Sequence, residues 1–191
     1  WHRSGARQAE GEYDRGRRTG TWTEWHPNGQ RAAKGEYSGG RKTGSWTSWH
    51  ENGARASEGV YDKGERVKTW TTWHENGRRA SEGSYLKGQK TGTWAAWHDN
   101  GEKASQGLFF EGKEDGRWTG WHPTGQKAFE GTYSKGNRTG RWTFTHANGR
   151  LASSGMYVNG VRDGVWKGVH PDGRPHFEEH YRDGQQDGPA L

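Results

Sequence analysis

Eight histidines stand at intervals of 24 residues, and they are the first side chains in the sequence that could do metal or acid–base chemistry. Metal binding needs several ligands within about 2 Å of one ion. If each interval is a repeat of two strands, equivalent histidines lie roughly 9.6 Å apart and share no ion. We therefore predict that each imidazole packs on the neighbouring tryptophan or bonds within its turn. The row consists of His2, His26, His50, His74, His98, His122, His146 and His170.

Only near the end of the chain do histidines come closer together, at His170, His176 and His180. They are a candidate for weak metal binding, and the acidic cluster of Glu111, Glu114 and Asp115 is a candidate for a calcium-like site that is more simply explained as a solvated turn. We predict no metal and no cofactor. Serine, histidine and aspartate recur as interchangeable copies, whereas a catalytic site needs one unique constellation in a pocket. Cysteine is absent, which excludes disulfides, thiolate metal sites and thiol catalysis. No motif that would cradle a phosphate occurs, so we predict that the protein is not an enzyme.

A row of tryptophans at the same spacing is the best candidate for a binding site. Flat aromatic rings at regular intervals can stack on sugars or bases, and arginines stand in the adjacent strand. The favoured alternative is that the row closes a second face of the sheet by packing on itself or on another chain. A net charge near zero in several copies weighs against nucleic acid. The candidate row comprises Trp25, Trp49, Trp73, Trp97 and Trp121, with Arg55 and Arg79 beside it.

The composition places the chain outside the usual globular classes. It has 191 residues, 33 of them glycine, and a net charge of +6. Isoleucine is absent and other aliphatic residues are scarce, which by itself would indicate disorder. The 13 tryptophans and 7 tyrosines are placed periodically, however, and so predict a patterned structure. No apolar run could cross a membrane, and no signal peptide is visible.

A 24-residue sequence pattern recurs without insertion or deletion. We therefore predict one repeat array over residues 1–191. The last copy has lost its opening tryptophan (Val169) and its central glycine (Glu179) and has gained Pro175, which suggests a degenerate C-terminal cap. The chain opens on Trp1 without a methionine, and we expect it to be a piece of a longer protein. Copies start at Trp1, Trp25, Trp49, Trp73, Trp97, Trp121, Thr145 and Val169.

Each copy predicts two strands and two turns. In the copy from Trp25 a turn at Asn28-Gly29 precedes a strand from Gln30 to Tyr37, and a second turn precedes a strand from Arg41 to Trp49. Asn-Gly is a strong hairpin signal, because both residues tolerate positive φ. No segment has helical periodicity. The predicted fold is therefore all-β, an elongated antiparallel meander or solenoid of eight 24-residue hairpin repeats.

The turns also predict a register in which aromatic rings lie beside strand glycines. Pairing Pro27 with Gln30 sets Trp25 opposite Ala32. At the other turn we expect Tyr13 to pair with Arg18 around a four-residue loop, with a three-residue loop bulged at Gly16 as the alternative. Further predicted pairs are Trp22 with Gly35, Gly20 with Tyr37, Gly11 with Gly20, Ala9 with Trp22 and Lys68 with Tyr85. The residues predicted to have this structural role are Tyr37, Trp46, Tyr61, Trp70, Tyr85, Trp94, Gly35, Gly44, Gly59, Gly83 and Gly92.

These residues carry a resemblance to a known family. The pattern Gly-x-Tyr-x-x-Gly-x-x-x-Gly-x-Trp, as in residues 83–94, resembles the MORN repeat. The added Trp-His-x-Asn-Gly, as in residues 97–101, is similar to the bacterial variant known as the YwqK-type antitoxin family. The resemblance implies an elongated β-meander with a scaffold or binding role. The 24-residue spacing and the doubled tryptophan depart from the eukaryotic pattern, which is associated with membrane attachment.

The predicted function is that of a non-enzymatic structural or interaction protein. We expect a bacterial array that scaffolds partners or assembles end to end into a filament through its open strand edges. One alternative is an antitoxin or immunity-type binder of a protein partner. Another is an adhesin that binds a glycan or an anionic membrane surface through the tryptophan row. Nucleic acid is the least expected partner. The sequence leaves the compartment open, with the bacterial surface or secretion favoured over the cytoplasm.

Overall fold

The computed structural model describes residues 1–2, 5 and 7–188, and every described regular element is a β-strand. Contacts divide the chain into two units, residues 1–91 and 92–191, and the division falls within one strand, β8 (Gln89–Trp97). The hydrogen-bonded order of the strands is the chain order, β1 to β16, in an open sheet. The all-β prediction is therefore confirmed. Since no described residue is helical, no described helix could span a membrane.

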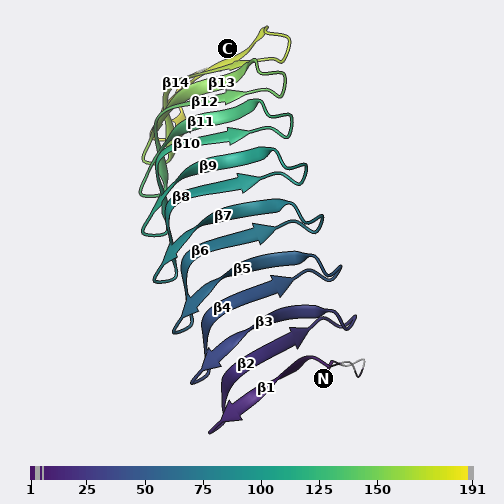
Figure 1. Cartoon of the computed structure of the whole chain (residues 1–191). Helices are drawn as coiled ribbons and strands as arrows, with labels where there is room; N and C mark the ends of the chain where they lie inside the picture. The colour runs from purple at the N-terminus through teal and green to yellow at the C-terminus, as the bar shows by residue number, and fades with distance from the viewer. Residues whose placement is uncertain (3–4, 6, 189–191) are drawn as a thin grey trace. The chain divides into compact units, whose positions relative to one another are not determined.

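The first unit consists of successive antiparallel hairpins (Figure 1). Its strands are β1 Ala9–Asp14, β2 Arg17–Trp25, β3 Arg31–Ser38, β4 Arg41–Trp49, β5 Arg55–Asp62, β6 Glu65–Trp73 and β7 Arg79–Leu86. The second unit continues the same alternation. Its strands after β8 are β9 Lys103–Phe110, β10 Lys113–Trp121, β11 Lys127–Ser134, β12 Asn137–Thr145, β13 Leu151–Val158, β14 Val161–Val169, β15 Pro175–Arg182 and β16 Gln185–Gln186.

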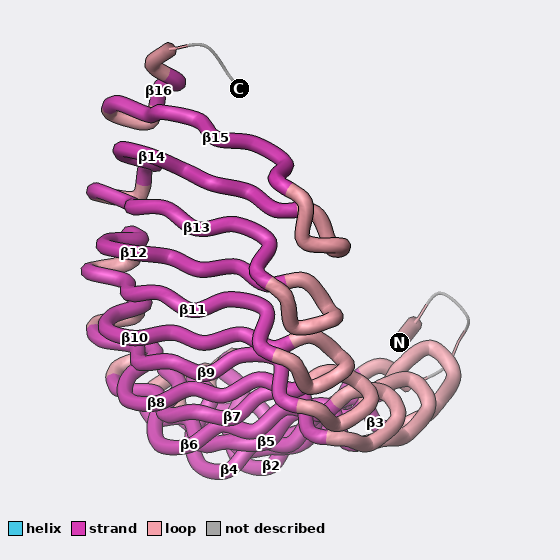
Figure 2. The backbone as a smooth tube through the Cα atoms, turned by 90° about the horizontal axis from the view of Figure 1, so that it is seen from above, coloured by secondary structure: helices cyan, strands magenta, loops and turns pink. Residues whose placement is uncertain are grey.

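The two kinds of turn are the reverse of what the dipeptides suggested. At Arg15-Gly16 both residues have positive φ, 47° and 77°, which defines a two-residue type I′ hairpin. Tyr13 therefore pairs with Arg18 as predicted, but Asp14 also pairs with Arg17, so the predicted four-residue loop was wrong, as was the bulged three-residue alternative. The tight turn thus lies at the variable x-x-Gly segment. Loops cap the strands of the second unit at both ends (Figure 2).

The Asn-Gly turn is wider than predicted. Only Gly29 has positive φ, and its amide donates to the carbonyl of His26, whose own amide donates to Gln30. This is a three-residue loop with a glycine bulge. Trp25 consequently pairs with Arg31 and not with Ala32, so the predicted pairing of Pro27 with Gln30 was also wrong.

In β2 and the equivalent strands, a bulge shifts the pairing of residues away from the predicted register. Between β1 and β2 the pairing jumps from Glu12–Thr19 to Glu10–Thr23, so the predicted pairs of Gly11 with Gly20 and Ala9 with Trp22 were wrong. The cause is the left-handed backbone at Gly20, where φ is 63°. Beyond the bulge the pairs Trp22–Gly35 and Gly20–Tyr37 are those predicted.

Tryptophan rings that pack against the backbone of strand glycines form the core of each unit. An ideal Cβ at Gly35 would lie 2.2 Å from the Trp46 ring, and one at Gly131 would lie 2.1 Å from Trp142. These rings alternate with tyrosines in edge-to-face contacts, such as Tyr37–Trp46 at 5.2 Å between centroids. Such contacts add to the burial of aromatic area. In the second unit Trp142 is fully buried. We call the side of the sheet that carries these rings the core face.

The structure places the other predicted structural residues in the same pattern. Gly59 pairs with Trp46 and lies under Trp70, which is 3% exposed. Gly83 pairs with Trp70. The residues at three bulges each pair with an aromatic residue of the next strand. Gly44 pairs with Tyr61, Lys68 with Tyr85, and Gly92 with Phe109, while Trp94 is buried and contacts Phe109 edge to face.

Candidate functional site

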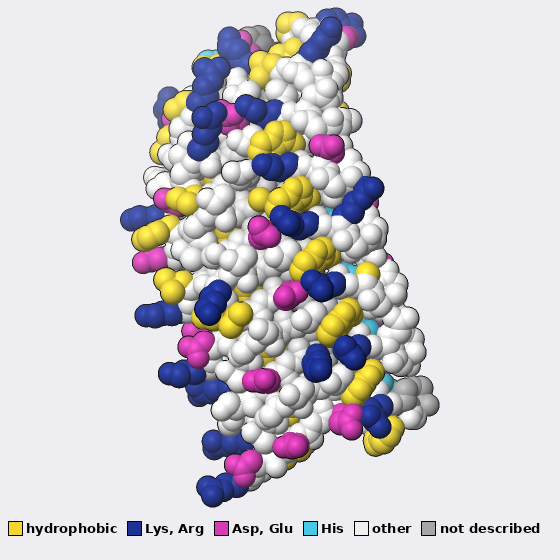
Figure 3. Space-filling view, in the orientation of Figure 1, with side chains coloured by type: hydrophobic (Ala, Val, Ile, Leu, Met, Phe, Trp, Pro, Cys, Tyr) yellow, Lys and Arg dark blue, Asp and Glu magenta, His cyan; other side chains and the backbone are white. Residues whose placement is uncertain are grey.

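The candidate tryptophan row lies at the ends of strands, on the side opposite the core face, which we call the outer face. Each of the five tryptophans is half-buried. The structure therefore neither exposes them as open platforms nor hides them in the core. Hydrophobic and basic side chains lie interleaved on the surface shown in Figure 3. The row consists of Trp25, Trp49, Trp73, Trp97 and Trp121, which end β2, β4, β6, β8 and β10.

A basic side chain from the preceding repeat covers one side of each indole for which the contact is described. The Arg55 guanidinium lies 5.1 Å from the centroid of Trp73, within the range of a cation–π contact. Because this side is occupied, a ligand reaches the indole from its other side or its edge. The corresponding contacts are Arg7 with Trp25 at 5.3 Å, Arg31 with Trp49 at 5.1 Å and Lys103 with Trp121 at 5.4 Å.

The arginines of the row are themselves paired with carboxylates three residues later. Arg55 contacts Glu58 at 2.9 Å, and Arg79 contacts Glu82 at 3.4 Å. These side chains are 38–54% exposed, so each pair contributes little to stability. Together they make this part of the outer face locally neutral while it remains rich in hydrogen-bonding groups.

Grooves on the outer face recur with matching walls. One groove, of about 310 Å³ in the first unit, lies between Arg55 and Trp73. A second, of about 410 Å³ in the second unit, is lined at every position by the residue 48 places further on. The paired linings are Ser45 and Thr93, Arg55 and Lys103, Glu58 and Gln106, Gly59 and Gly107, Val60 and Leu108, Thr69 and Arg117, Thr71 and Thr119, and Trp73 and Trp121.

A third groove, of about 240 Å³, repeats the pattern after another 48 residues, with Met156 and Val165 in its wall. An apolar side chain marks the same position in each groove, at Val60, Leu108 and Met156. The intervening copies have a polar residue at this position. It is Glu36, Ser84 and Thr132 in the second, fourth and sixth copies. This longer period holds from the second copy to the seventh, whereas the first copy has Glu12 at the position of the apolar residue.

The histidine row joins consecutive repeats. The Nε2 atom of His26 lies 2.8 Å from the carbonyl oxygen of Trp49, in the next repeat. Because a carbonyl oxygen only accepts, Nε2 must carry the proton. We predicted that each imidazole packs on the neighbouring tryptophan or bonds within its turn. That prediction was wrong, because the imidazole bonds to a backbone carbonyl of the next repeat. The same contact, at 2.7–2.8 Å, is described for His2, His50, His98, His122 and His146.

The asparagine of the Asn-Gly turn has a matching role. Its Oδ1 accepts the amide two residues on, as for Asn28 and Gln30 at 3.0 Å. Its Nδ2 donates to a carbonyl of the next turn, as for Asn28 and Glu51 at 2.7 Å. Both functions of the side chain are thus used structurally. The Trp-His-x-Asn-Gly motif connects neighbouring turns, and this explains its recurrence without a ligand.

The three C-terminal histidines do not come together. The rings of His170 and His176 lie 4.2 Å apart between centroids, and no ring contact with His180 is described. Among residues 1–2, 5 and 7–188, no three metal-ligating side chains form a group that could hold an ion.

Three segments match the family model described as a MORN repeat variant, at residues 18–38, 42–63 and 114–135. Together they cover less than half of the chain. Each match spans two strands and the turn between them: β2 and β3 or β4 and β5, joined by His-x-Asn-Gly, or β10 and β11, joined by His-x-Thr-Gly. No curated protein matches the chain.

Proposed function

We propose that this protein is a non-enzymatic repeat protein that binds an extended partner along the outer face of its sheet. The observation that carries this proposal is the recurrence of three grooves with matching walls at steps of 48 residues. The grooves beside Trp73 and Trp121 offer a ligand closely similar chemistry, whereas the third groove has Lys167 in place of the threonine and no tryptophan in its lining. The match of three segments to a MORN repeat variant supports a binding role, since such repeats often serve in interactions.

The size of the grooves favours an extended ligand over a small one. At about 240–410 Å³ they lie at or below the lower end of small-molecule pockets, which span about 300–1,000 Å³. One groove alone therefore gives weak binding. A partner that occupies two linked grooves gains affinity through effective concentration. In the second unit the two grooves are four strands apart, or roughly 19 Å.

The proposal of a non-catalytic role rests on the same repetition. The histidines, the most versatile general bases, bond to backbone carbonyls of the next repeat. No groove differs from the others by a unique set of acid, base and nucleophile. We therefore assign the outer face to recognition.

Substitutions that fill single grooves test the proposal. Thr71→Lys and Thr119→Lys place a long side chain in the grooves of the first and second unit, and Lys167 already stands at the equivalent position of the third. Arrays of extended peptides and neutral glycans would identify ligands of the wild-type protein. We expect each substitution to weaken binding and the double variant to weaken it most.

The matched control is Thr23→Lys, the same position in a copy where Glu12 stands in place of the apolar groove residue. It should leave the affinity unchanged. Binding of every identified ligand with equal affinity by the double variant and the wild type would refute the assignment.

A neutral glycan is the second candidate, and the internal pairing of Arg55 with Glu58 favours it. The pair offers donors and acceptors without net charge, next to hydroxyl groups and a tryptophan edge. An anionic polymer would have to displace the carboxylate. Electrophoresis through gels that contain a soluble neutral polysaccharide should retard the wild-type protein more than Thr71→Lys. Equal mobility with and without the polysaccharide would exclude this ligand.

Two other roles suggested by the sequence have less support. End-to-end assembly would use the sheet edges, and none of the described contacts favours it. No sequence motif, and no contact within the described part of the chain, favours an antitoxin role or binding to a membrane surface. We therefore propose recognition of an extended partner ahead of these.

A further inference from the structure

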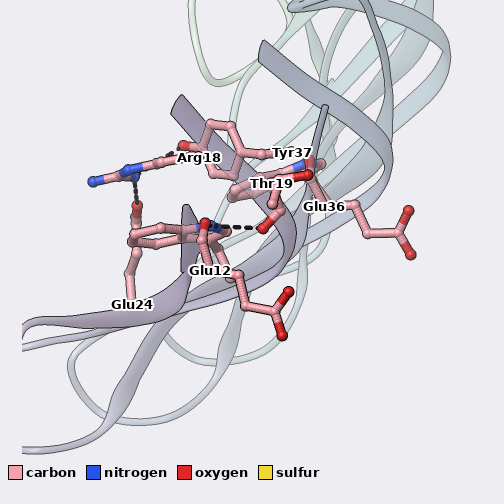
Figure 4. A network of polar contacts seen from close by, with 8 residues as sticks. Glu12, Arg18, Thr19, Glu24, Glu36 and Tyr37 are labelled. Atoms are coloured by element: carbon pink, nitrogen blue, oxygen red, sulfur yellow. Dashed lines mark hydrogen bonds and ion pairs between the residues drawn. The ribbon is translucent and has the colours of Figure 1, made fainter. Parts of the chain in front are cut away.

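An internal ion pair on the core face shows how this face binds a carboxylate. Arg18 donates from Nη1 to Oε1 of Glu24 at 3.0 Å and to the hydroxyl of Tyr37 at 3.2 Å (Figure 4). Its guanidinium lies 4.2 Å from the centroid of Trp22. The side chains of Arg18 and Glu24 are 35% and 32% exposed. The carboxylate therefore sits at the surface, held by a cation that aromatic rings orient.

The next two repeats keep the cation and lose the carboxylate. Lys42 and Arg66 replace Arg18, while Ser48 and Thr72 replace Glu24. Lys42 Nζ lies 4.0 Å from the Trp46 ring, and the Arg66 guanidinium lies 4.3 Å from Trp70. The cation thus packs on the equivalent tryptophan ring in all three repeats.

Hydroxyl groups occupy the place of the missing carboxylate. Ser48 Oγ lies 2.7 Å from Ser57 Oγ, and Thr72 Oγ1 lies 2.7 Å from Ser81 Oγ. Hydroxyls donate hydrogen bonds to an anion as readily as they bond to each other. Because Ser48 and Thr72 stand at the position from which Glu24 binds Arg18, we infer that these hydroxyls help the cation to complete an oxyanion site.

No built-in anion competes for these two cations. Among the described ion pairs none involves Lys42 or Arg66. Arg66 donates to the neutral hydroxyl of Tyr85 at 3.2 Å. Burial disfavours the charge on Arg66, but hydrogen bonds with Tyr61 and Tyr85 outweigh it, so its pKa is raised. Both sites therefore carry an uncompensated positive charge.

We propose that Lys42 and Arg66 form two carboxylate-binding sites for an acidic segment of a partner protein, each site accepting a side chain where Glu24 binds Arg18. The two cations are two strands apart, roughly 9.6 Å. In a segment with the polyproline II conformation, which has three residues per turn, residues i and i+3 project from the same side and are separated by about 9.3 Å. A segment with a glutamate at every third position, lying across the strands, would reach both sites.

The second unit holds a further internal occupant of the same kind. Glu179 lies 3.6 Å from Arg162 and accepts a bond from the Tyr181 hydroxyl at 2.7 Å. In both cases the bound group is a glutamate side chain, which favours a protein partner over other polyanions. Because Trp70 and Thr72 alternate with Thr69 and Thr71 along β6, the sites face away from the grooves. The inference therefore does not depend on what the grooves bind.

Variants in which a new glutamate of the protein itself fills a proposed site test the proposal. The probe is a fluorescently labelled Gly/Ser peptide with glutamate at every third position, and the measurement is its anisotropy at moderate salt. Ser48→Glu and Thr72→Glu each recreate the arrangement of Glu24 and fill one site. We expect each to weaken binding about threefold to fivefold, the range of an exposed ion pair. Glu24→Ser should open a third site at Arg18 and tighten binding.

The charge-matched control is Ser38→Glu, at the hairpin end where Asp14 and Asp62 show that an acid is tolerated. It should bind the peptide like the wild type, and circular dichroism should confirm that all variants are folded. Equal affinities of wild type, Ser48→Glu and Thr72→Glu would overturn the two sites. So would the absence of peptide binding to the wild type. Equal binding of a peptide with adjacent glutamates, or of an acidic polysaccharide, would overturn the assignment of the partner.

Discussion

Lys68 pairs directly with Tyr85 while its own backbone is left-handed, with φ at 60°. Six other copies have a glycine at this bulge, with φ between 63° and 68°. A side chain there carries a steric penalty of about 1–2 kcal/mol that glycine avoids. The third copy therefore keeps the bulge at the expense of local strain.

Lys68→Gly should relieve this strain and raise the free energy of unfolding by about 1 kcal/mol. Urea denaturation followed by tryptophan fluorescence measures the change. Thr69→Gly, one residue later, is the control, and it should destabilise because its backbone is extended. A lower urea midpoint for Lys68→Gly would mean that the lysine side chain contributes more than the strain removes.

Gly59→Ala should destabilise the protein by about 1–3 kcal/mol, the usual range for an overpacked core. A Cβ at this position would lie 2.1 Å from the Trp70 ring, so the ring must move. Trp70→Leu leaves room for the methyl group. In that background the same substitution should have little effect, and a full penalty there would contradict the ring-on-glycine contact.

His50→Ala should lower the free energy of unfolding by about 1 kcal/mol, because it removes the bond from Nε2 to the carbonyl of Trp73. Asn52→Ala removes two described bonds, to Glu75 and to the amide of Ala54, and should be at least as damaging. The control is His170→Ala in the last turn, where the ring stacks on His176. Equal effects at His50 and His170 would show that the bond between repeats contributes nothing.

Acid should weaken the contribution of Glu130. Hydrogen bonding to Lys127 and, next, to Arg117 lowers the pKa of Glu130 below its ordinary value of 4.5. A carboxylate with a depressed pKa in the folded state stabilises fully above that ordinary value, and the contribution is lost as the pH falls through the lower folded value. The difference in unfolding free energy between the wild type and Glu130→Gln should therefore shrink below about pH 4.5. A difference that grows with acidity would have the wrong sign.

Aromatic periodicity predicted the strands and the part of the register in which a ring lies beside a strand glycine, such as Trp22 with Gly35, but not the pairing across the bulges and the Asn-Gly turns. The turns were harder to predict. Asn28 was expected to take positive φ, yet its side chain bonds both Gln30 and Glu51 and holds the wider loop. Contacts that reach into the next repeat decide this geometry, and a single hairpin does not contain them.

The candidate site was predicted only in part. The sequence indicated that Arg55 and the tryptophans share a surface, but not that Arg55 covers Trp73 from the preceding repeat. Nor did one repeat reveal the grooves, since their walls come from three strands and their apolar residue from every second copy. These features depend on the order of the copies and are lost when the copies are averaged.

The bonds from histidines and asparagines reach the residue 23 places ahead and no further. None of these described bonds depends on the total number of repeats in the chain. Unequal recombination between copies could therefore lengthen or shorten the gene by whole repeats and still encode a chain that folds. An exchange of two copies at a time would also preserve the alternation of apolar and polar positions along the outer face.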